Sequence, residues 1–147
     1  MTHEYAGKYA LKHAPGTKLN ERIAKAIQEN SPGGELECGV AERIAKELNV
    51  SILEVGTTAD LMEIKIKKCQ LGLFGWGNKP NHGKDIRPVE SVPFEIKYAL
   101  EKVAEKGRVT CASLWKIADR LGKERKEVST ACETLGLKIC QCQLGTF

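Results

Sequence analysis

The sequence predicts a mainly α-helical fold with short β-strands, arranged as two tandem copies of one small unit. Shifting the chain by 73 positions aligns residues 19–74 with residues 92–147 without a gap, and 17 of the 56 aligned pairs are identical. Within each copy, apolar residues recur at the three- and four-residue spacing of an amphipathic helix. An internal repeat of this length is a strong signal of architecture, so the two copies define the domain organisation.

The repeat divides the chain into four parts, which are an N-terminal segment (1–18), a first copy (19–74), a linker (75–91) and a second copy (92–147). Glycine and proline mark the linker by composition. The linker also contains Trp76, and an aromatic residue of this size favours docking of part of the linker on a domain. The N-terminal segment is predicted to form a short helix. A 56-residue copy buries little surface alone, so we expect the copies to pack on each other or on a second chain.

Each copy is predicted to contain three helices and two extended pieces. The first helix carries Ile23 and Ile27 in one copy and Ile96 and Leu100 in the other. We expect Pro32-Gly33-Gly34 to end the first of these helices and Gly107 to end the second, because such residues terminate helices. The other elements are expected at residues 35–38 and 108–111 (extended), 40–48 and 113–121 (helix), 51–62 and 124–135 (helix), and 64–71 and 137–144 (strand).

The closing strand of each copy changes its apolar phase. Ile64 and Ile66 lie on one face of an ideal strand, whereas Cys69 and Leu71 lie on the other. The second copy repeats this shift. The pattern predicts a bulge, or a strand that is covered first on one side and then on the other.

A second pattern concerns the middle of each copy, where Ala45, Asn49 and Val55 recur as Ala118, Gly122 and Val128. A small residue permits a close helix crossing, Asn or Gly tolerates a positive φ at the turn, and an apolar residue in the next helix fixes the angle. This spacing resembles the helix-turn-helix motif. With a helix before it and a strand after it, each copy is similar to the winged-helix variant, although the second copy stops at Phe147 after one wing strand.

The resemblance implies a DNA-binding or transcription-regulatory protein, in which the third helix enters the major groove. The first copy presents Ser51, Ile52, Leu53 and Glu54 at that position, which is a poor surface for DNA because it has no cation. The second copy is therefore expected to be the DNA reader. Its candidate nucleic-acid-binding residues are Arg125, Lys126, Ser129 and Thr130, with Lys116, Arg120 and Lys123 as backbone contacts.

Two alternatives remain open from the sequence. One is a protein–protein adaptor that does not bind DNA, and Trp115 is consistent with it because Trp is enriched in interfaces. Trp115 can equally pack under the linker or the N-terminal segment. The other alternative is a thiol-based metal or redox sensor that uses Cys111, Cys140 and Cys142. Small buried core thiols are the more ordinary interpretation of these cysteines, because their spacing is not that of a zinc site.

Composition and charge narrow the classes of function that the sequence allows. The net charge is +4, with zero net charge over residues 1–74 and +3 over residues 92–147, which permits nucleic-acid contact without requiring it. No apolar run reaches the length of a membrane span, and the N-terminus has no signal-peptide pattern, so we expect a cytoplasmic protein. The sequence contains no nucleotide-binding glycine loop and no Gly-x-Ser-x-Gly motif, so we expect neither enzymatic activity nor a cofactor.

Overall fold

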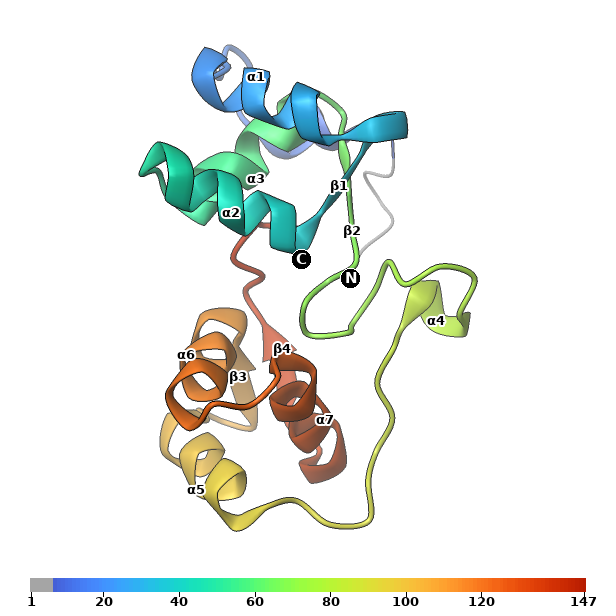
Figure 1. Ribbon diagram of the computed structural model, residues 1–147, viewed down its shortest axis with the longest axis vertical. Helices are drawn as coiled ribbons and strands as arrows, with labels where there is room; N and C mark the ends of the chain where they lie inside the picture. The colour runs from blue at the N-terminus through green and yellow to red at the C-terminus, as the bar shows by residue number, and fades with distance from the viewer. Residues whose placement is uncertain (1–6) are drawn as a thin grey trace. The chain divides into compact units, whose positions relative to one another are not determined.

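The computed structural model describes residues 7–147, and this range is mainly helical with four short strands (Figure 1). The chain forms two compact units whose limits differ from those of the sequence repeats. Unit 1 comprises the chain up to Cys69 together with residues 143–147, and unit 2 comprises residues 70–142. The predicted mainly α fold with short strands is confirmed, but each compact unit contains the closing segment of the other repeat.

Unit 1 contains three main helices and two strands in the predicted order. The elements are η1 (Tyr9–Lys12), α1 (Glu21–Asn30), η2 (Pro32–Gly34), β1 (Glu35–Glu37), α2 (Cys38–Leu48), α3 (Ile52–Leu61) and β2 (Lys65–Lys67). Unit 2 contains α4 (Pro80–Gly83), α5 (Phe94–Val103), β3 (Arg108–Thr110), α6 (Cys111–Leu121), α7 (Arg125–Leu135) and β4 (Lys138–Cys140). The predicted short helix of the N-terminal segment is η1.

Local sequence explains where most of these helices begin and end. The Asn20 side chain accepts a hydrogen bond from the Ile23 amide at 3.1 Å and so caps α1. Asn49 (φ 53°) and Gly122 (φ 65°) adopt the left-handed conformation predicted for the turns after α2 and α6. The expected end of α5 at Gly107 is wrong, because α5 already ends at Val103 and Gly107 lies in the turn before β3.

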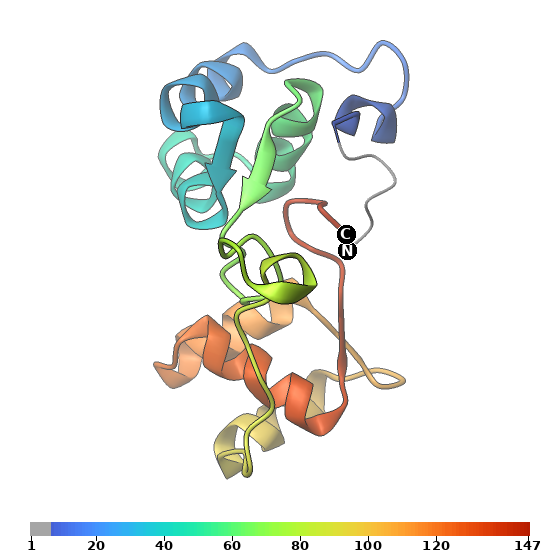
Figure 2. The same ribbon diagram turned by 90° about the vertical axis from the view of Figure 1, so that its right-hand side faces the viewer.

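The strands form two separate pairs, and both pairs are parallel. Leu36 of β1 lies opposite Ile66 of β2, and Val109 of β3 lies opposite Ile139 of β4. The arrows of β1 and β2 point the same way in Figure 2. Each pair joins the two extended pieces of one sequence repeat, but the strands are only three residues long.

The predicted irregularity of the closing strands has a definite position. Lys68 follows β2 with φ 50°, and its counterpart Gln141 follows β4 with φ 51°. A non-glycine residue in the left-handed region reverses the alternation of side chains and ends the strand. This backbone reversal accounts for the shift between the face of Ile66 and the face of Cys69 and Leu71.

The core of each unit is aliphatic and repeats with the 73-residue shift. Ile23, Ile27, Leu36, Ile44 and Val55 are buried in unit 1, and their counterparts Ile96, Leu100, Val109, Ile117 and Val128 are buried in unit 2. One further leucine completes each core from the other repeat: Leu144 in unit 1 and Leu71 in unit 2. Burial of a leucine side chain contributes about 1.5–3 kcal/mol, so these segments are part of the fold.

Within residues 7–147, no helix combines the length and the apolar character that a membrane crossing requires.

Candidate functional site: the third helix of each unit

The third helix of each unit is held against the second helix by the predicted tight turn. In unit 1 the Val50 amide donates to the Ala45 carbonyl at 3.0 Å, and in unit 2 the Lys123 amide donates to the Ala118 carbonyl at 2.9 Å. Val55 and Val128, which were predicted to lock the crossing, are both fully buried. Helix α7 therefore follows α6 across a tight turn and is packed against it through Val128.

Arg125, the first of the candidate nucleic-acid-binding residues, is engaged within unit 2. Its guanidinium carbon lies 3.9 Å from the centroid of the buried Trp115 ring. The guanidinium also donates to the Gln70 side-chain oxygen at 3.0 Å and pairs with Asp119 at 3.1 Å, and the side chain is 15% exposed. Stacking on an indole and pairing with a carboxylate both favour this position for a cation.

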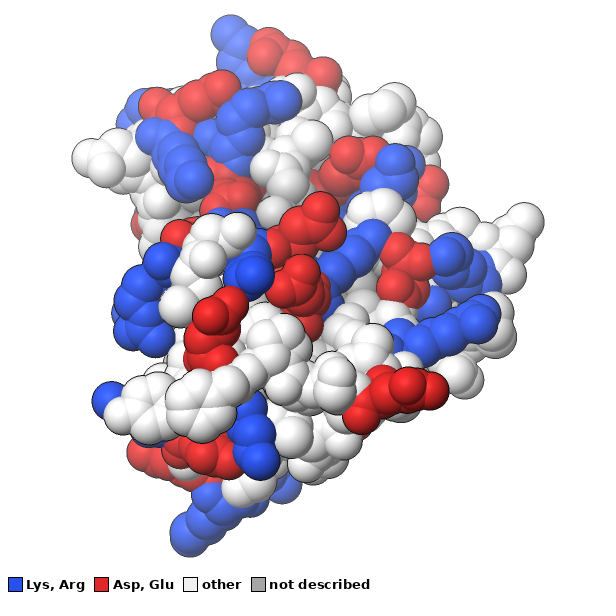
Figure 3. All heavy atoms as spheres, turned by 60° about the horizontal axis from the view of Figure 1, so that its bottom comes forward, with Lys and Arg blue, Asp and Glu red and all other residues white. Residues whose placement is uncertain are grey.

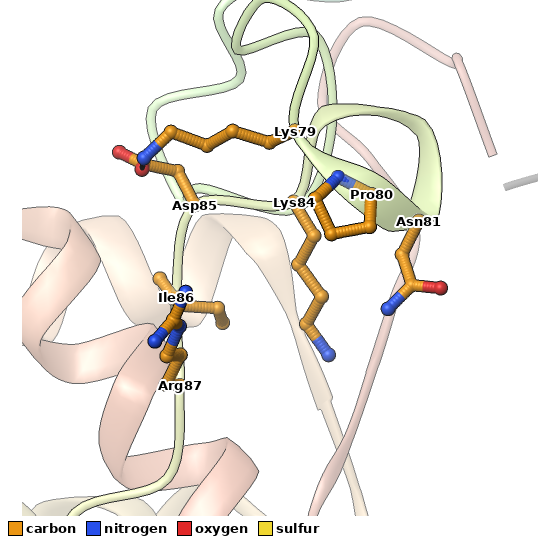
Figure 4. A pocket seen from close by; sticks show the side chains of 7 residues that line it. All are labelled: Lys79, Pro80, Asn81, Lys84, Asp85, Ile86 and Arg87. Carbon is orange, nitrogen blue, oxygen red and sulfur yellow. Dashed lines mark hydrogen bonds and ion pairs between the residues drawn. The ribbon is translucent and has the colours of Figure 1, made fainter.

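Lys126 is held by the linker. Its ammonium lies 3.3 Å from the centroid of the Trp76 ring and pairs with Asp85, which also pairs with Lys79 (Figure 4). Hydrogen bonds from Lys126 and then from Lys79 lower the pKa of Asp85 from 3.8 to about 2, although desolvation opposes the shift. The second cation of the predicted reading surface is thus neutralised by a residue of the chain itself.

The two hydroxyl residues among the predicted contacts, Ser129 and Thr130, are both engaged within unit 2. Ser129 is fully buried, and its Oγ has no hydrogen-bond partner within residues 7–147. Thr130 donates its hydroxyl hydrogen bond to the Lys126 carbonyl at 2.7 Å within α7. Ser129 therefore belongs to the core, which contradicts its prediction as a nucleic-acid-binding residue.

The predicted backbone contacts on and after α6 are in part accessible. Lys116 and Arg120 are exposed. Lys123 is half-buried and pairs with Glu95 at 3.4 Å. Along residues 124–135, the exposed positions are Glu124 and Glu127, both acidic. Basic and acidic side chains are interspersed on the face shown in Figure 3.

The linker also docks on the C-terminal half of α7, as part of it was expected to dock on a domain. The Lys84 ammonium contacts both carboxylate oxygens of Glu133 at 2.8 Å, and the Val89 amide donates to the Thr134 hydroxyl at 2.9 Å. A hollow of about 370 Å³ lies in this segment and is lined by Lys79, Pro80, Asn81, Lys84, Asp85, Ile86 and Arg87 (Figure 4). Two of its cations, Lys79 and Lys84, already pair with carboxylates.

Helix α3 of unit 1 is covered in the equivalent place by residues 143–147. A Cβ atom at Gly56 would lie 2.8 Å from the Leu144 Cα and closer still to the Leu144 carbonyl oxygen. A Cβ at Gly145 would lie 3.3 Å from the Leu53 side chain. Gly72 is the counterpart of Gly145, and Lys126 is the counterpart of Leu53. A Cβ at Gly72 would lie 3.4 Å from the Lys126 side chain. The two closing segments therefore lie beside equivalent residues of the two helices, Leu53 and Lys126.

The C-terminal end of α3 is held by the N-terminal segment. The carboxylate of Glu63 accepts hydrogen bonds from the amides of Tyr9 and Ala10 at 2.7 and 2.9 Å. Asp60 is buried and pairs with Lys12 at 3.0 Å and with His13 at 2.8 Å. Asp60 is the counterpart of Glu133, so both units place cations from the preceding segment on the same acidic position.

The cysteines do not form a metal centre in the described part of the chain. Among residues 7–147, no three His, Cys, Asp or Glu side chains are placed to hold a metal ion, so Cys111, Cys140 and Cys142 are not brought together as ligands. Cys140 donates to the Val109 carbonyl at 3.4 Å. None of the six cysteines forms a disulfide. Burial raises the pKa of Cys132 to about 12, so this thiol stays protonated.

Sequence reasoning missed the partners of the α7 cations, which are Gln70, Trp76 and Asp85. One signal was present: Trp115 and Arg125 are both specific to the second copy, where the first copy has Glu42 and Ile52. Most aligned positions differ between the copies, so this difference does not by itself identify the Arg125–Trp115 stack.

Comparisons with protein-family models, with curated proteins and with solved structures found no match to this chain.

Proposed function

We propose that this protein is a protein–protein interaction adaptor built from two helix-turn-helix units, and that it does not read DNA sequence through α7. The observation that carries the proposal is the state of Arg125 and Lys126. Both cations are bound by residues of unit 2, and the exposed residues along 124–135 are Glu124 and Glu127. An acidic exposed surface repels phosphates, whose attraction supplies most of the affinity for DNA.

The helix-turn-helix part of the proposal is supported by the turns at Asn49 and Gly122 and by the buried Val55 and Val128. The wing receives less support. Each closing strand is followed by a left-handed residue, Lys68 or Gln141, rather than by a returning strand. The proposal therefore concerns two trihelical units that resemble winged-helix domains without the hairpin wing.

A candidate partner surface lies on α5. Phe94 is 78% exposed and Tyr98 is 50% exposed, and their rings stack with centroids 5.9 Å apart. The Lys102 ammonium lies 4.5 Å from the Tyr98 ring centroid. The corresponding residues of α1 are Glu21 and Lys25, which suit solvent. Exposed aromatic residues dominate the binding energy of many protein interfaces, so we assign partner recognition to this face.

Two measurements test the proposal. A fluorescence titration with mixed-sequence duplex DNA at low salt should show no binding that depends on Arg125 and Lys126. In a pull-down, Phe94→Ala/Tyr98→Ala should lose partners that the wild type retains, whereas the matched variant Glu21→Ala/Lys25→Ala should keep them. Steeply salt-dependent DNA binding that Arg125→Ala/Lys126→Ala abolishes would contradict the adaptor function.

A second candidate function is DNA backbone binding by unit 2 through α6. Unit 2 carries 13 Lys and Arg against nine Asp and Glu, whereas unit 1 carries ten of each. Lys116 and Arg120 are exposed one helical turn apart. In this case Lys116→Ala/Arg120→Ala should weaken DNA binding and lower its salt dependence by about one unit of slope per residue removed. No change in either quantity would exclude this surface.

A further inference from the structure

Unit 1 contains a docking site that is filled by a peptide segment from a distant part of the sequence. Leu144 is 3% exposed in the core of unit 1, and its backbone lies so close to Gly56 that no side chain fits there. The Lys12 ammonium donates to the Gly145 carbonyl at 3.1 Å. The site therefore combines an apolar pocket for a leucine, a close backbone approach and a cation on a carbonyl.

The same kind of segment fills the equivalent site of unit 2. Residues 70–74 and 143–147 both read Gln-Leu-Gly-x-Phe. Leu71 is fully buried, and Gly72 lies against Lys126 as Gly145 lies against Leu53. The recurrence indicates that each trihelical unit has a place for a Gln-Leu-Gly-x-Phe segment, although Ser129 at the counterpart of Gly56 prevents the same close backbone approach in unit 2.

The residues that connect unit 2 to the docked segment 143–147 contribute little to the docking site of unit 1. Residue 142 ends unit 2 and residue 143 belongs to unit 1. Strand β4 has already ended at Cys140, and residues 141–147 contain no helix or strand. The contacts of Leu144 and Gly145 in unit 1 are therefore the same whether the segment belongs to the same chain or to another copy.

We propose that the site on α3 also binds the segment 143–147 of a second copy of this chain, so that two copies can exchange their closing segments. Exchange of an identical element between protomers creates a dimer without new contacts. The intramolecular segment competes at an effective concentration of order millimolar. The protein is accordingly a monomer at micromolar concentration, and exchange dominates where a partner or surface concentrates it locally. This inference does not rest on the adaptor function.

The test mixes two full-length variants with complementary defects. Gly56→Ala blocks the site and leaves the segment intact, whereas Leu144→Asp disables the segment and leaves the site intact. Addition of unlabelled Gly56→Ala to ¹⁵N-labelled Leu144→Asp should shift the amide signals of Leu53 and Gly56, and the shifts should saturate as the concentration of Gly56→Ala rises. The matched control is the unlabelled double variant Gly56→Ala/Leu144→Asp, which should produce no shift. Equal shifts with both additions, or none with either, would overturn the proposal.

A second measurement covers the case in which Leu144→Asp does not fold. Wild-type protein refolded at about 1 mM and then diluted should contain a species of twice the 16.2 kDa chain mass, which size-exclusion chromatography with light scattering detects. Gly56→Ala treated in the same way should contain none, because its site accepts no segment from either source. A dimer fraction that is the same in both proteins, or absent from both, would contradict the exchange.

Discussion

Helices α3 and α7 occupy equivalent places in the two units, yet their first turns have opposite character. Helix α3 presents Ile52 and Leu53 where α7 presents Arg125 and Lys126. Each helix is covered by a closing segment, and the side chains of the helix match the cover. Leu53 lies near Gly145, whereas Lys126 lies over Trp76 and pairs with Asp85. A cation at the start of the third helix is therefore explained by intramolecular packing, without reference to DNA.

The C-terminal ends of α3 and α7, by contrast, have the same character. Asp60 and Glu133 are both acidic, and a lysine of the preceding segment reaches each of them, namely Lys12 and Lys84. The N-terminal segment and the linker thus perform the same structural task in their units. The two lysines are not counterparts in the repeat, because the 73-residue shift places Lys12 on Asp85.

The largest expected effect comes from removing the leucine that completes each core. Leu71→Ala and Leu144→Ala should each lower the free energy of unfolding by about 2–5 kcal/mol, because both side chains are buried. Hydrogen exchange should show lost protection in unit 2 for Leu71→Ala and in unit 1 for Leu144→Ala. Loss of protection in the opposite unit would contradict the assignment of the closing segments.

A smaller effect separates the equivalent positions 56 and 129. Gly56→Ala should destabilise the protein by about 2–3 kcal/mol, because the added carbon overlaps the Leu144 backbone and displaces the buried Leu144 side chain. Ser129→Ala should be neutral or stabilising, since it removes a buried hydroxyl that has no hydrogen-bond partner within residues 7–147. Urea unfolding measures both changes. Similar losses of stability for the two variants would show that residues 143–147 pack on α3 in the same way as residues 70–74 pack on α7.

A third comparison concerns how the two helices begin. Ser51 accepts a hydrogen bond from the Glu54 amide at 3.1 Å, and the Glu54 carboxylate accepts from the Ser51 amide at 2.8 Å, whereas Glu124 makes no such side-chain cap on α7. Ser51→Ala should therefore cost about 1 kcal/mol. Glu124→Ala should change the melting temperature less. An equal shift for both would show that the cap contributes no stability of its own.

The smallest effect is the acid response of the linker contact. The pKa of Asp85 is lowered from 3.8 to about 2 in the folded protein, so its pairing stabilises the fold above pH 4 and is lost as the pH falls toward 2. The indole NH signal of Trp76 in NMR spectra should shift over this range in the wild type. Asp85→Asn should remove that shift and leave the contacts of Lys12 with Asp60 unchanged. A Trp76 titration that persists in Asp85→Asn would assign it to another group.

Sequence reasoning succeeded where the signal is local. The helix faces around Ile44 and Ile117, the turns at Asn49 and Gly122, and the irregular closing strands all follow from residue spacing, and the structure has them in these places. The strands proved shorter than predicted because Lys68 and Gln141 turn the backbone away. Periodicity locates such a change of phase but does not give the backbone angle that causes it.

The sequence could not predict which closing segment packs on α3 and which packs on α7, and the reason is physical. Leu71 and Leu144 are identical residues at the same place in the repeat, so the apolar pattern is the same whether each completes its own unit or the other one. The pairing of Arg125 with Gln70 and Trp115 is likewise invisible to local patterns, because Gln70 is 55 positions away. An expectation that the charged residues of a helix face solvent ignores such distant partners.

The placement of residues 143–147 in unit 1 has a consequence for biosynthesis. A ribosome makes the helices of unit 1 first, but the segment that closes that unit emerges after all of unit 2. Domains generally fold in the order of their synthesis, and here that order is reversed. A chain that ends at residue 142 would contain every residue of unit 2 but would lack the segment that covers Gly56 of unit 1.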